Sequence, residues 1–311
     1  MMTSNLSAHQ EAVRRAVCDG LPSEPLVSGF DLARIRVSFR ERLRAIAADL
    51  PPDSIRVNRA AGPKALACPA SSESDFEWKA MFASRSLGLP VVAQIRERPN
   101  LGATTGVRAR IEDEIARQSN LGKWLEGLDA AGRSAVLASA VTWVGKVCVA
   151  VPWASFESVR FPAQQAWHRP LGYNTSVVLN GRYDAAVEFR KPKAAERVII
   201  SIGRHSSESE RVDLLAVCLE GNGRIPLRSV TVDTATGATT VTSVTTEFLE
   251  IAVDDVERIA TLLAPKGRGE HLVTVPGPQC WWCDHRSECT TGLSWMASQP
   301  RRRGGIPLSS K

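Results

Sequence analysis

The stretch Pro276-Gly-Pro-Gln-Cys280-Trp-Trp-Cys283-Asp-His-Arg-Ser-Glu-Cys289 places three thiols close together in the spacing C-x2-C-x5-C. Two cysteines three positions apart can ligate one metal when a turn separates them, and a third cysteine a few residues later can join them. Three thiolates leave a tetrahedral ion or an iron–sulfur cluster one ligand short. The stretch therefore predicts a soft-metal site whose fourth ligand comes from elsewhere in the chain.

The composition is that of an ordinary globular protein. The chain has 311 residues, of which 43% are hydrophobic and 23% charged, which excludes a disordered chain. Its net charge of +6 favours an anionic partner such as DNA, although an unspecialised basic surface gives the same balance. The seven cysteines and the lack of an apolar leader near residue 1 predict a reducing cytoplasm, where thiols stay free or bind metal.

Residues 134–154 form a nearly uncharged segment that approaches the length of a membrane span. Lys146 lies inside the segment, and Gly145 and Pro152 interrupt it. We therefore expect a buried helix that runs into a strand, and no membrane association.

Apolar spacing divides the chain into a helical first half and a second half rich in strands. Helices are expected over residues 8–17, 31–50 and 75–86, and throughout 105–149. Strands are expected over residues 176–179, 181–189, 197–202, 227–233 and 239–247, with helices over 210–219 and 253–263. The pattern predicts a mixed α/β fold. Five arginines in the helix over 31–50 are expected to form a solvated face, with phosphate contact as the alternative: Arg34, Arg36, Arg40, Arg42 and Arg44.

This order of elements, followed by the thiol run, resembles the RecB-like branch of the PD-(D/E)XK nuclease superfamily, over residues 57–292. The resemblance implies a restriction-endonuclease-like fold, in which helices flank a central mixed sheet. It also implies a helical region over 1–55, a nuclease-like domain over 56–292 and a basic flexible tail over 293–311.

Some members of this branch carry an iron–sulfur cluster, with one cysteine near the start of the nuclease domain and three at its end. Cys68, in Ala-Leu-Ala-Cys-Pro, stands where the upstream cysteine belongs. The resemblance thus implies a [4Fe–4S] cluster that joins both ends of the domain through Cys68, Cys280, Cys283 and Cys289. A structural zinc site is the alternative, with Cys68, His271 or His285 as the fourth ligand. Cys18, Cys148 and Cys218 are expected to be ordinary core residues.

Active members of the superfamily hold a divalent cation with an Asp and a Glu, and a Lys assists. Gly181-Arg-Tyr-Asp184 resembles the motif that supplies the Asp, so Asp184 is the retained metal-ligand position. The D/E-x-K motif of the next strand is replaced by Ser201-Ile-Gly203, which carries neither a carboxylate nor a lysine. Magnesium or manganese is therefore expected only if an active site has been rebuilt.

Two further motifs are also altered. Gly106 to Glu114 has the spacing of the family's G-x-x-x-H-x-x-x-E, but Arg110 occupies the histidine position, and a guanidinium cannot ligate a cation. The helix over 210–219 carries Asp213 and Val217 where the family has Gln and Tyr. Arg110 could instead pair with a phosphate.

A relocated active site would need new ligands around Asp184. Glu188 shares its strand face, but four residues at about 3.3 Å each place the two Cα atoms roughly 13 Å apart. His205, Glu208 and Glu210 are the remaining candidates.

These observations predict a catalytically inactive nuclease-fold protein. It would act as a DNA-binding or scaffold subunit in DNA processing or defence, with a helicase or an active nuclease as its partner. Arg110 and the tail residues Arg301, Arg302 and Arg303 are the candidate DNA contacts. The alternatives are an active metal-dependent nuclease with a relocated site around Asp184, and an interaction protein that binds zinc but no nucleic acid.

Overall fold

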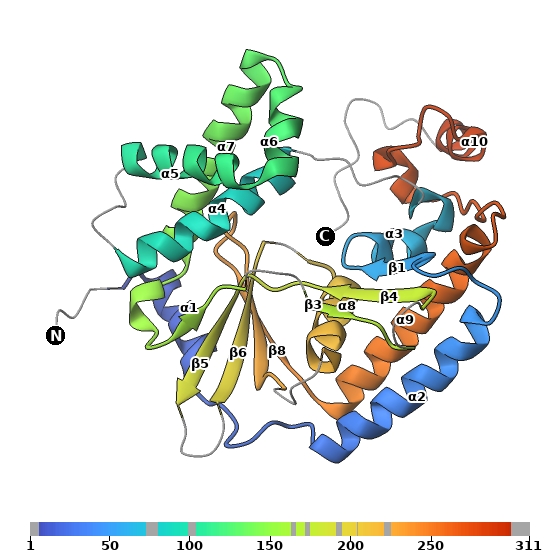
Figure 1. Ribbon diagram of the computed structural model, residues 1–311, viewed down its shortest axis with the longest axis horizontal. Helices are drawn as coiled ribbons and strands as arrows, with labels where there is room; N and C mark the ends of the chain where they lie inside the picture. Colours follow the sequence, from blue (N-terminus) through green and yellow to red (C-terminus); the bar gives the residue numbers. More distant parts are fainter. Residues whose placement is uncertain are drawn as a thin grey trace.

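The structure is a computed structural model that describes residues 6–72, 80–98, 104–162, 166–171, 175–190, 195–203, 205–220 and 225–299. Two sheets are surrounded by helices, which confirms the mixed α/β fold with a mixed sheet (Figure 1). The larger sheet has the order β2-β5-β6-β7-β8 and the smaller sheet has the order β1-β4-β3.

The larger sheet is built from two hairpins and one crossover. Its strands are β2 (Val159–Arg160), β5 (Ala185–Arg190), β6 (Ala195–Ile202), β7 (Arg228–Val232) and β8 (Thr239–Ser243). β5 and β6 pair in antiparallel fashion, whereas β6 and β7 are parallel. The helix α8 (Ser207–Leu219) makes the crossover between β6 and β7. The β5–β6 hairpin places the start of β5 beside the end of β6.

The smaller sheet contains strands that the sequence did not predict. β1 (Ile55–Asn58) lies parallel to β4 (Val177–Gly181), and β3 (Ala166–His168) is antiparallel to β4. β1 and β3 have only four and three residues, too few for alternation to identify a strand. The strand expected over 239–247 was too long. The Thr245 hydroxyl accepts the Phe248 N–H and caps α9 (Thr246–Gly267).

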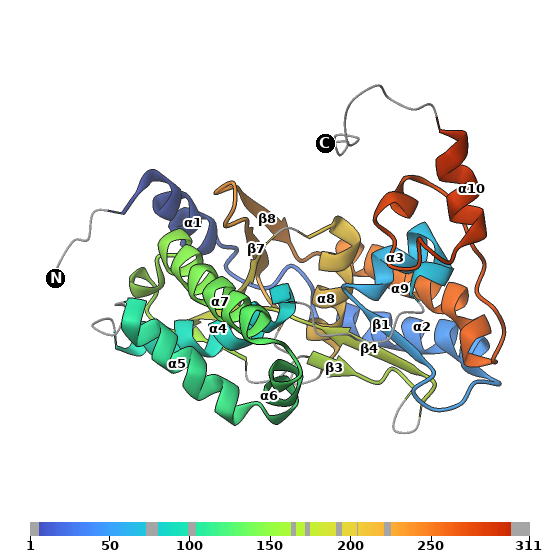
Figure 2. The ribbon, with the colours of Figure 1, turned by 90° about the horizontal axis from the view of Figure 1, so that it is seen from above.

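Hydrophobic layers cover both faces of the β5–β6 hairpin. Val187 and Ile200 belong to a cluster that includes buried residues of α1 (Ala8–Cys18), α4 (Ala80–Glu97) and α5 (Thr104–Arg117). Ala186 and Ile199 belong to a second cluster, with residues of α2 (Gly29–Ala47), α3 (Ala61–Ala67), α8 and α9. Figure 2 shows α4 and α7 (Ala130–Ala150) grouped apart from α2 and α9. Because α1 and α2 contribute to these two cores, residues 8–47 pack together with the described residues that follow them.

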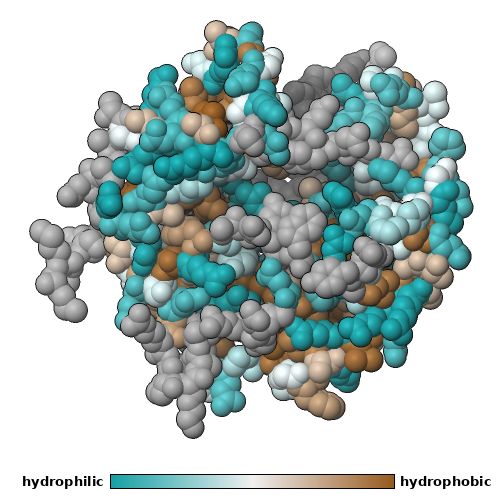
Figure 3. Space-filling view, in the orientation of Figure 1, coloured by the Kyte–Doolittle hydropathy of each residue, from teal (hydrophilic) through white to brown (hydrophobic). Residues whose placement is uncertain are grey.

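The arginines of α2 are largely used within the protein. Arg34 pairs with Glu250 at 2.8 Å, and Arg42 pairs with Asp254 at 2.6 Å. Arg36 donates to the carbonyls of Cys218 and Leu219, and Arg40 donates to the carbonyl of Pro170. Figure 1 shows that α2 lies alongside α9, and Figure 3 shows hydrophilic side chains over this part of the surface. These arginines therefore hold α2 against α8 and α9.

The apolar segment over 134–154 lies in α7 (Ala130–Ala150), which packs against α4 and α5. By length and composition α7 could cross a membrane, and it is the only helix of the described residues that passes this test. Val136, Ala140, Val144 and Val147 are buried, but Val149 is 70% exposed. The expectation of a helix that runs into a strand is wrong, because a 3-10 turn (Trp153–Ser155) follows α7. The helix is buried along one side only.

Candidate functional site

The four predicted cysteine ligands line one small cavity. Cys68, Cys280, Cys283 and Cys289 all contribute to its wall, together with Gly292 and other residues of both ends of the domain. Cys68 and Cys280 are buried, at 6% and 7% exposure, whereas Cys283 and Cys289 are half-buried. More than two hundred residues of sequence separate Cys68 from the other three. The fold therefore brings the upstream cysteine to the C-terminal run, as the sequence predicted.

The C-terminal segment reaches Cys68 by docking on α3 and the turn that follows it. The Ala70 N–H donates to the Val273 carbonyl at 3.3 Å, and the Gln279 side chain donates to the Ala67 carbonyl at 3.1 Å. Lys64 and Asp284 form an ion pair at 3.0 Å. Figures 1 and 2 both show this C-terminal segment beside α3. We call the paired segments 61–72 and 272–292 the clasp.

Backbone N–H groups point at three of the four sulfurs. Cys68 Sγ accepts from Val275 N at 3.4 Å, and Cys280 Sγ accepts from Gly277 N at 3.4 Å. Cys289 caps α10 (Thr290–Ser298), and its Sγ accepts from Gly292 N at 3.3 Å. Backbone N–H groups that donate to cysteine sulfurs are also found around metal centres ligated by cysteine.

The donor set fits a metal held by sulfur. Four thiols satisfy either a [4Fe–4S] cluster or a zinc ion with four thiolate ligands. Among the described residues that line the cavity, no histidine is present. Within the described residues, however, no three His, Cys, Asp or Glu side chains lie in metal-binding geometry, so the four thiols line the cavity without forming a closed coordination shell.

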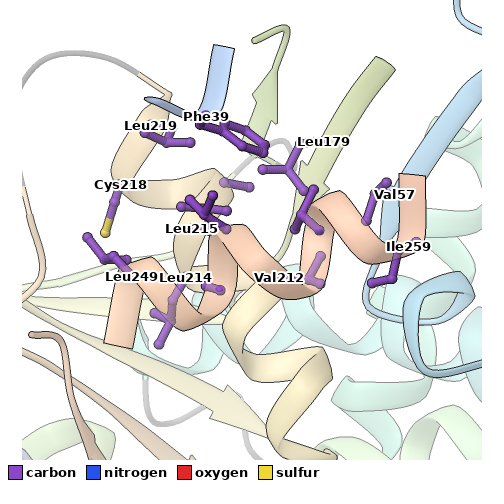
Figure 4. Packing of buried hydrophobic residues seen from close by; sticks show 14 of the residues in the cluster. Phe39, Val57, Leu179, Val212, Leu214, Leu215, Cys218, Leu219, Leu249 and Ile259 are labelled. Atoms are coloured by element: carbon purple, nitrogen blue, oxygen red, sulfur yellow. The ribbon is translucent and has the colours of Figure 1, made fainter. Parts of the chain in front are cut away.

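The remaining three cysteines lie in hydrophobic surroundings. Cys218 belongs to the core around α8 and α9, where Figure 4 shows it beside Leu249. Burial raises the pKa of Cys218 to about 12 and that of Cys148 to about 11. Cys18 and Cys148 pack on the other core. These thiols behave as the small apolar residues that the sequence predicted.

The second predicted site centres on Asp184, whose side chain is fully buried. Asp184 directly precedes β5, and its backbone N–H donates to the Ile200 carbonyl at 2.9 Å. Its carboxylate is enclosed by donors. Arg85 Nε lies 3.0 Å from Oδ1, Arg85 Nη2 pairs with Oδ2, and the Ile202 N–H donates to Oδ2 at 2.7 Å.

Arg85 keeps the buried Asp184 carboxylate ionised. Burial alone raises the pKa of Asp184, but the guanidinium groups of Arg85 and Arg182 and the hydrogen bond from Arg85 lower it below the usual value. The Arg85 guanidinium therefore occupies both carboxylate oxygens through which Asp184 would bind a metal ion.

Ser201 and Gly203 lie close to Asp184 along β6. Ser201 is buried at 6% exposure, one residue before the Ile202 N–H that binds Asp184. Gly203 follows β6 with a φ of +107°, a backbone conformation that residues with a Cβ rarely adopt. A lysine at position 203 would therefore strain the backbone as it now stands.

Arg110 contacts a different part of the helical layer. It lies on α5, and its Nη1 donates to the Gln94 side chain of α4. The cation on Asp184 is instead Arg85, nine residues before Gln94 on the same helix. The sequence offered one signal for Arg85, since it is the only charged residue between Ala80 and Gln94.

A second ion pair lies next to the first. Arg59, which follows β1, places Nη2 2.9 Å from Asp213 Oδ2 on α8. The Arg182 N–H donates to Asp213 Oδ1 at 2.8 Å. Burial raises the pKa of Asp213 to about 7, although Arg59 and the Arg182 N–H oppose this shift. Arg59 carried no sequence signal, because β1 itself was not predicted.

The other carboxylates considered as metal ligands have partners elsewhere. Glu210 Oε2 accepts from the Thr242 hydroxyl at 3.0 Å, and Glu208 lies 3.8 Å from Arg211. Glu188 faces Arg197 across the β5–β6 pair. Burial and the nearby Arg59 lower the pKa of His205 to about 4, so this side chain is neutral at pH 7. The tail residues Arg301, Arg302 and Arg303 lie outside the described residues.

No family model matches this chain, and no curated protein matches it.

Proposed function

We propose that this chain is a catalytically inactive protein of RecB-like nuclease type that binds DNA as a scaffold subunit in DNA processing or defence. The ion pair between Arg85 and Asp184 carries this proposal. A helicase or an active nuclease would be the partner that supplies the chemistry.

Metal-dependent phosphodiester cleavage needs a divalent cation held by several hard oxygens. Asp184 offers its oxygens to Arg85 and to the Ile202 N–H instead. Ser201 and Gly203 contribute no carboxylate and no amine at the two neighbouring positions. The arrangement therefore favours a site beside the β5–β6 hairpin in which the Arg85 guanidinium takes the place of a divalent metal ion.

We propose that the clasp holds a [4Fe–4S] cluster through Cys68, Cys280, Cys283 and Cys289, with zinc as the alternative. When bound, the cluster would supply metal–thiolate bonds that cross-link segments 61–72 and 272–292. The N–H groups of Val275, Gly277 and Gly292 support this assignment, because they donate to three of the four sulfurs, as backbone N–H groups do around cysteine-ligated clusters. The role of the metal is structural: it would fix the C-terminal segment against the start of the domain.

The net charge of +6 supports binding to a polyanion. Since most of the α2 arginines are engaged within the protein, DNA contact at that helix is disfavoured. Contact with the sugar–phosphate backbone would give affinity without sequence preference and would weaken with salt.

One preparation of the protein is enough to test the proposed function against both alternatives, the active nuclease and the zinc-binding interaction protein. The protein is purified without oxygen, and its iron and zinc are measured together with the absorbance at about 400 nm that iron–sulfur clusters produce. Binding of single- and double-stranded DNA is then followed by fluorescence anisotropy at several salt concentrations, and cleavage is assayed with magnesium and manganese. We expect salt-sensitive binding and no cleavage.

The rivals give different results in the same experiment. Metal-dependent cleavage that disappears in Asp184→Ala would establish the active nuclease. Bound zinc without salt-sensitive DNA binding would establish the interaction protein. Either outcome would overturn the proposed function.

A further inference from the structure

Three guanidinium groups converge around Asp184 and Asp213. Arg59 follows β1, Arg85 lies on α4 and Arg182 follows β4, so three separate segments supply them. The side chains of Arg59 and Arg85 are only 16% and 14% exposed. Cations rarely gather in a poorly solvated place unless anions balance them.

Asp184 and Asp213 are the carboxylates in contact with these guanidiniums, and Glu210 acts on Arg59 from farther away. Arg85 is committed to Asp184 through two of its nitrogens. Arg59 reaches Asp213 through Nη2 alone. Burial raises the pKa of Asp213 to about 7, so near neutral pH this group carries only part of a charge. Burial and the neighbouring Arg85 also lower the pKa of Arg182 to about 10, which reflects crowding of like charges.

Arg59 retains donors with no partner. Its Nε and Nη1 are enclosed and make no hydrogen bond within the described part of the chain. Its backbone carbonyl accepts from the Ser209 hydroxyl at 2.8 Å, which ties it to the first turn of α8. The N-terminus of this 13-residue helix adds a partial positive charge on the same side.

We propose that Arg59 and Arg182 form a binding site for a phosphate-type oxyanion beside the Arg85–Asp184 pair. A tetrahedral oxyanion accepts several N–H donors at once, and arginine is suited to paired contacts with it. The site would bind without a divalent cation. The inference rests on the proposed function only for the source of the phosphate, which is either the DNA backbone or a free phosphate.

The test follows thermal unfolding of the full chain against inorganic phosphate, with chloride at matched ionic strength as the reference. Wild type is compared with Arg59→Gln and Arg182→Gln. Arg56→Gln is the control, because Arg56 lies on β1, three residues before Arg59, but is exposed. We expect saturable stabilisation of wild type and Arg56→Gln, and an affinity at least about tenfold weaker in the other two variants.

Arg59→Gln leaves Asp213 without its cation, so this variant could fail to fold. The double variant Arg59→Gln/Asp213→Asn removes both charges of the pair and keeps the carbonyl oxygen that the Arg182 N–H requires. We expect this variant to fold and to lose phosphate stabilisation. Stabilisation equal to that of wild type would overturn the inference.

Competition between phosphate and a labelled oligonucleotide distinguishes the two phosphate sources. It also tests the inference separately from the proposed function. Phosphate that displaces a labelled oligonucleotide in wild type, but not in Arg182→Gln, would assign the site to the DNA backbone. Phosphate binding in a protein that binds no DNA would support a site for free phosphate, and the proposed function would fail. DNA binding without any saturable effect of phosphate would refute the inference and leave the proposed function in place.

Discussion

Arg85 Nε donates to Asp184 Oδ1 at 3.0 Å, from a helix 99 residues away in the sequence. This contact gives the buried carboxylate a fixed cation, where a nuclease of the resembled family would hold an exchangeable metal ion. The local chemistry of Asp184 therefore depends on Arg85 of α4 together with the Ile202 N–H at the end of β6.

Arg85→Gln is expected to destabilise the protein by about 3 kcal/mol, because it leaves Asp184 charged and buried without its cation. Urea unfolding at pH 7 measures this change. The control is Arg108→Gln, which removes an exposed pair with Glu112 and should cost less than about 0.5 kcal/mol. The double variant Arg85→Gln/Asp184→Asn should lose less than the sum of its single changes. Equal effects of Arg85→Gln and Arg108→Gln would contradict the role assigned to this pair.

Gly181→Ala is expected to cost about 2 kcal/mol or more. A Cβ at Gly181 would lie 2.5 Å from both the Ala216 Cβ and the Asp213 carbonyl oxygen, so β4 and α8 would have to separate. Gly145→Ala is the matched control, because a Cβ there meets nothing within 4 Å and the helix α7 gains an alanine. That substitution should stabilise by about 0.5–1 kcal/mol. Denaturant midpoints give both values, and a neutral Gly181→Ala would refute the close contact.

Cys68→Ser is expected to release bound metal, because it removes the ligand that joins the two halves of the clasp. Metal per chain is measured by mass spectrometry after purification without oxygen. Cys148→Ser removes a cysteine that lies outside the cavity and should leave the metal content unchanged. Full metal content in Cys68→Ser would show that the C-terminal run finds its fourth ligand elsewhere.

Asp213→Asn is expected to change how stability depends on pH. The pKa of Asp213 is about 7 in the folded protein and near 3.8 when unfolded, so the folded state binds the proton more tightly. The contribution of Asp213 to stability is therefore full below pH 3.8 and is lost as pH rises towards and through 7. Urea unfolding at pH 5 and pH 8 should show a smaller decrease in stability for Asp213→Asn than for wild type. Equal decreases in the two proteins would contradict the assignment.

The sequence by itself identified the elements that rest on long periodic patterns. Helices α2, α8 and α9 and the β5–β6 hairpin were predicted, because their apolar residues recur at regular spacing. It also identified the three C-terminal cysteines from their spacing, and Cys68 by resemblance. By the same resemblance, Ser201 and Gly203 stand at positions where a nuclease of that family would carry a carboxylate and a lysine.

Only the tertiary structure decided which charges meet. β1 is too short for alternation to reveal, so the position of Arg59 against Asp213 could not be foreseen. Arg85 was visible as the only charge between Ala80 and Gln94, but its partner depends on how α4 packs over the sheet. Spacing along the chain predicts local structure and nearby ligands. Pairing between distant side chains depends on the packing of whole layers, which no local pattern encodes.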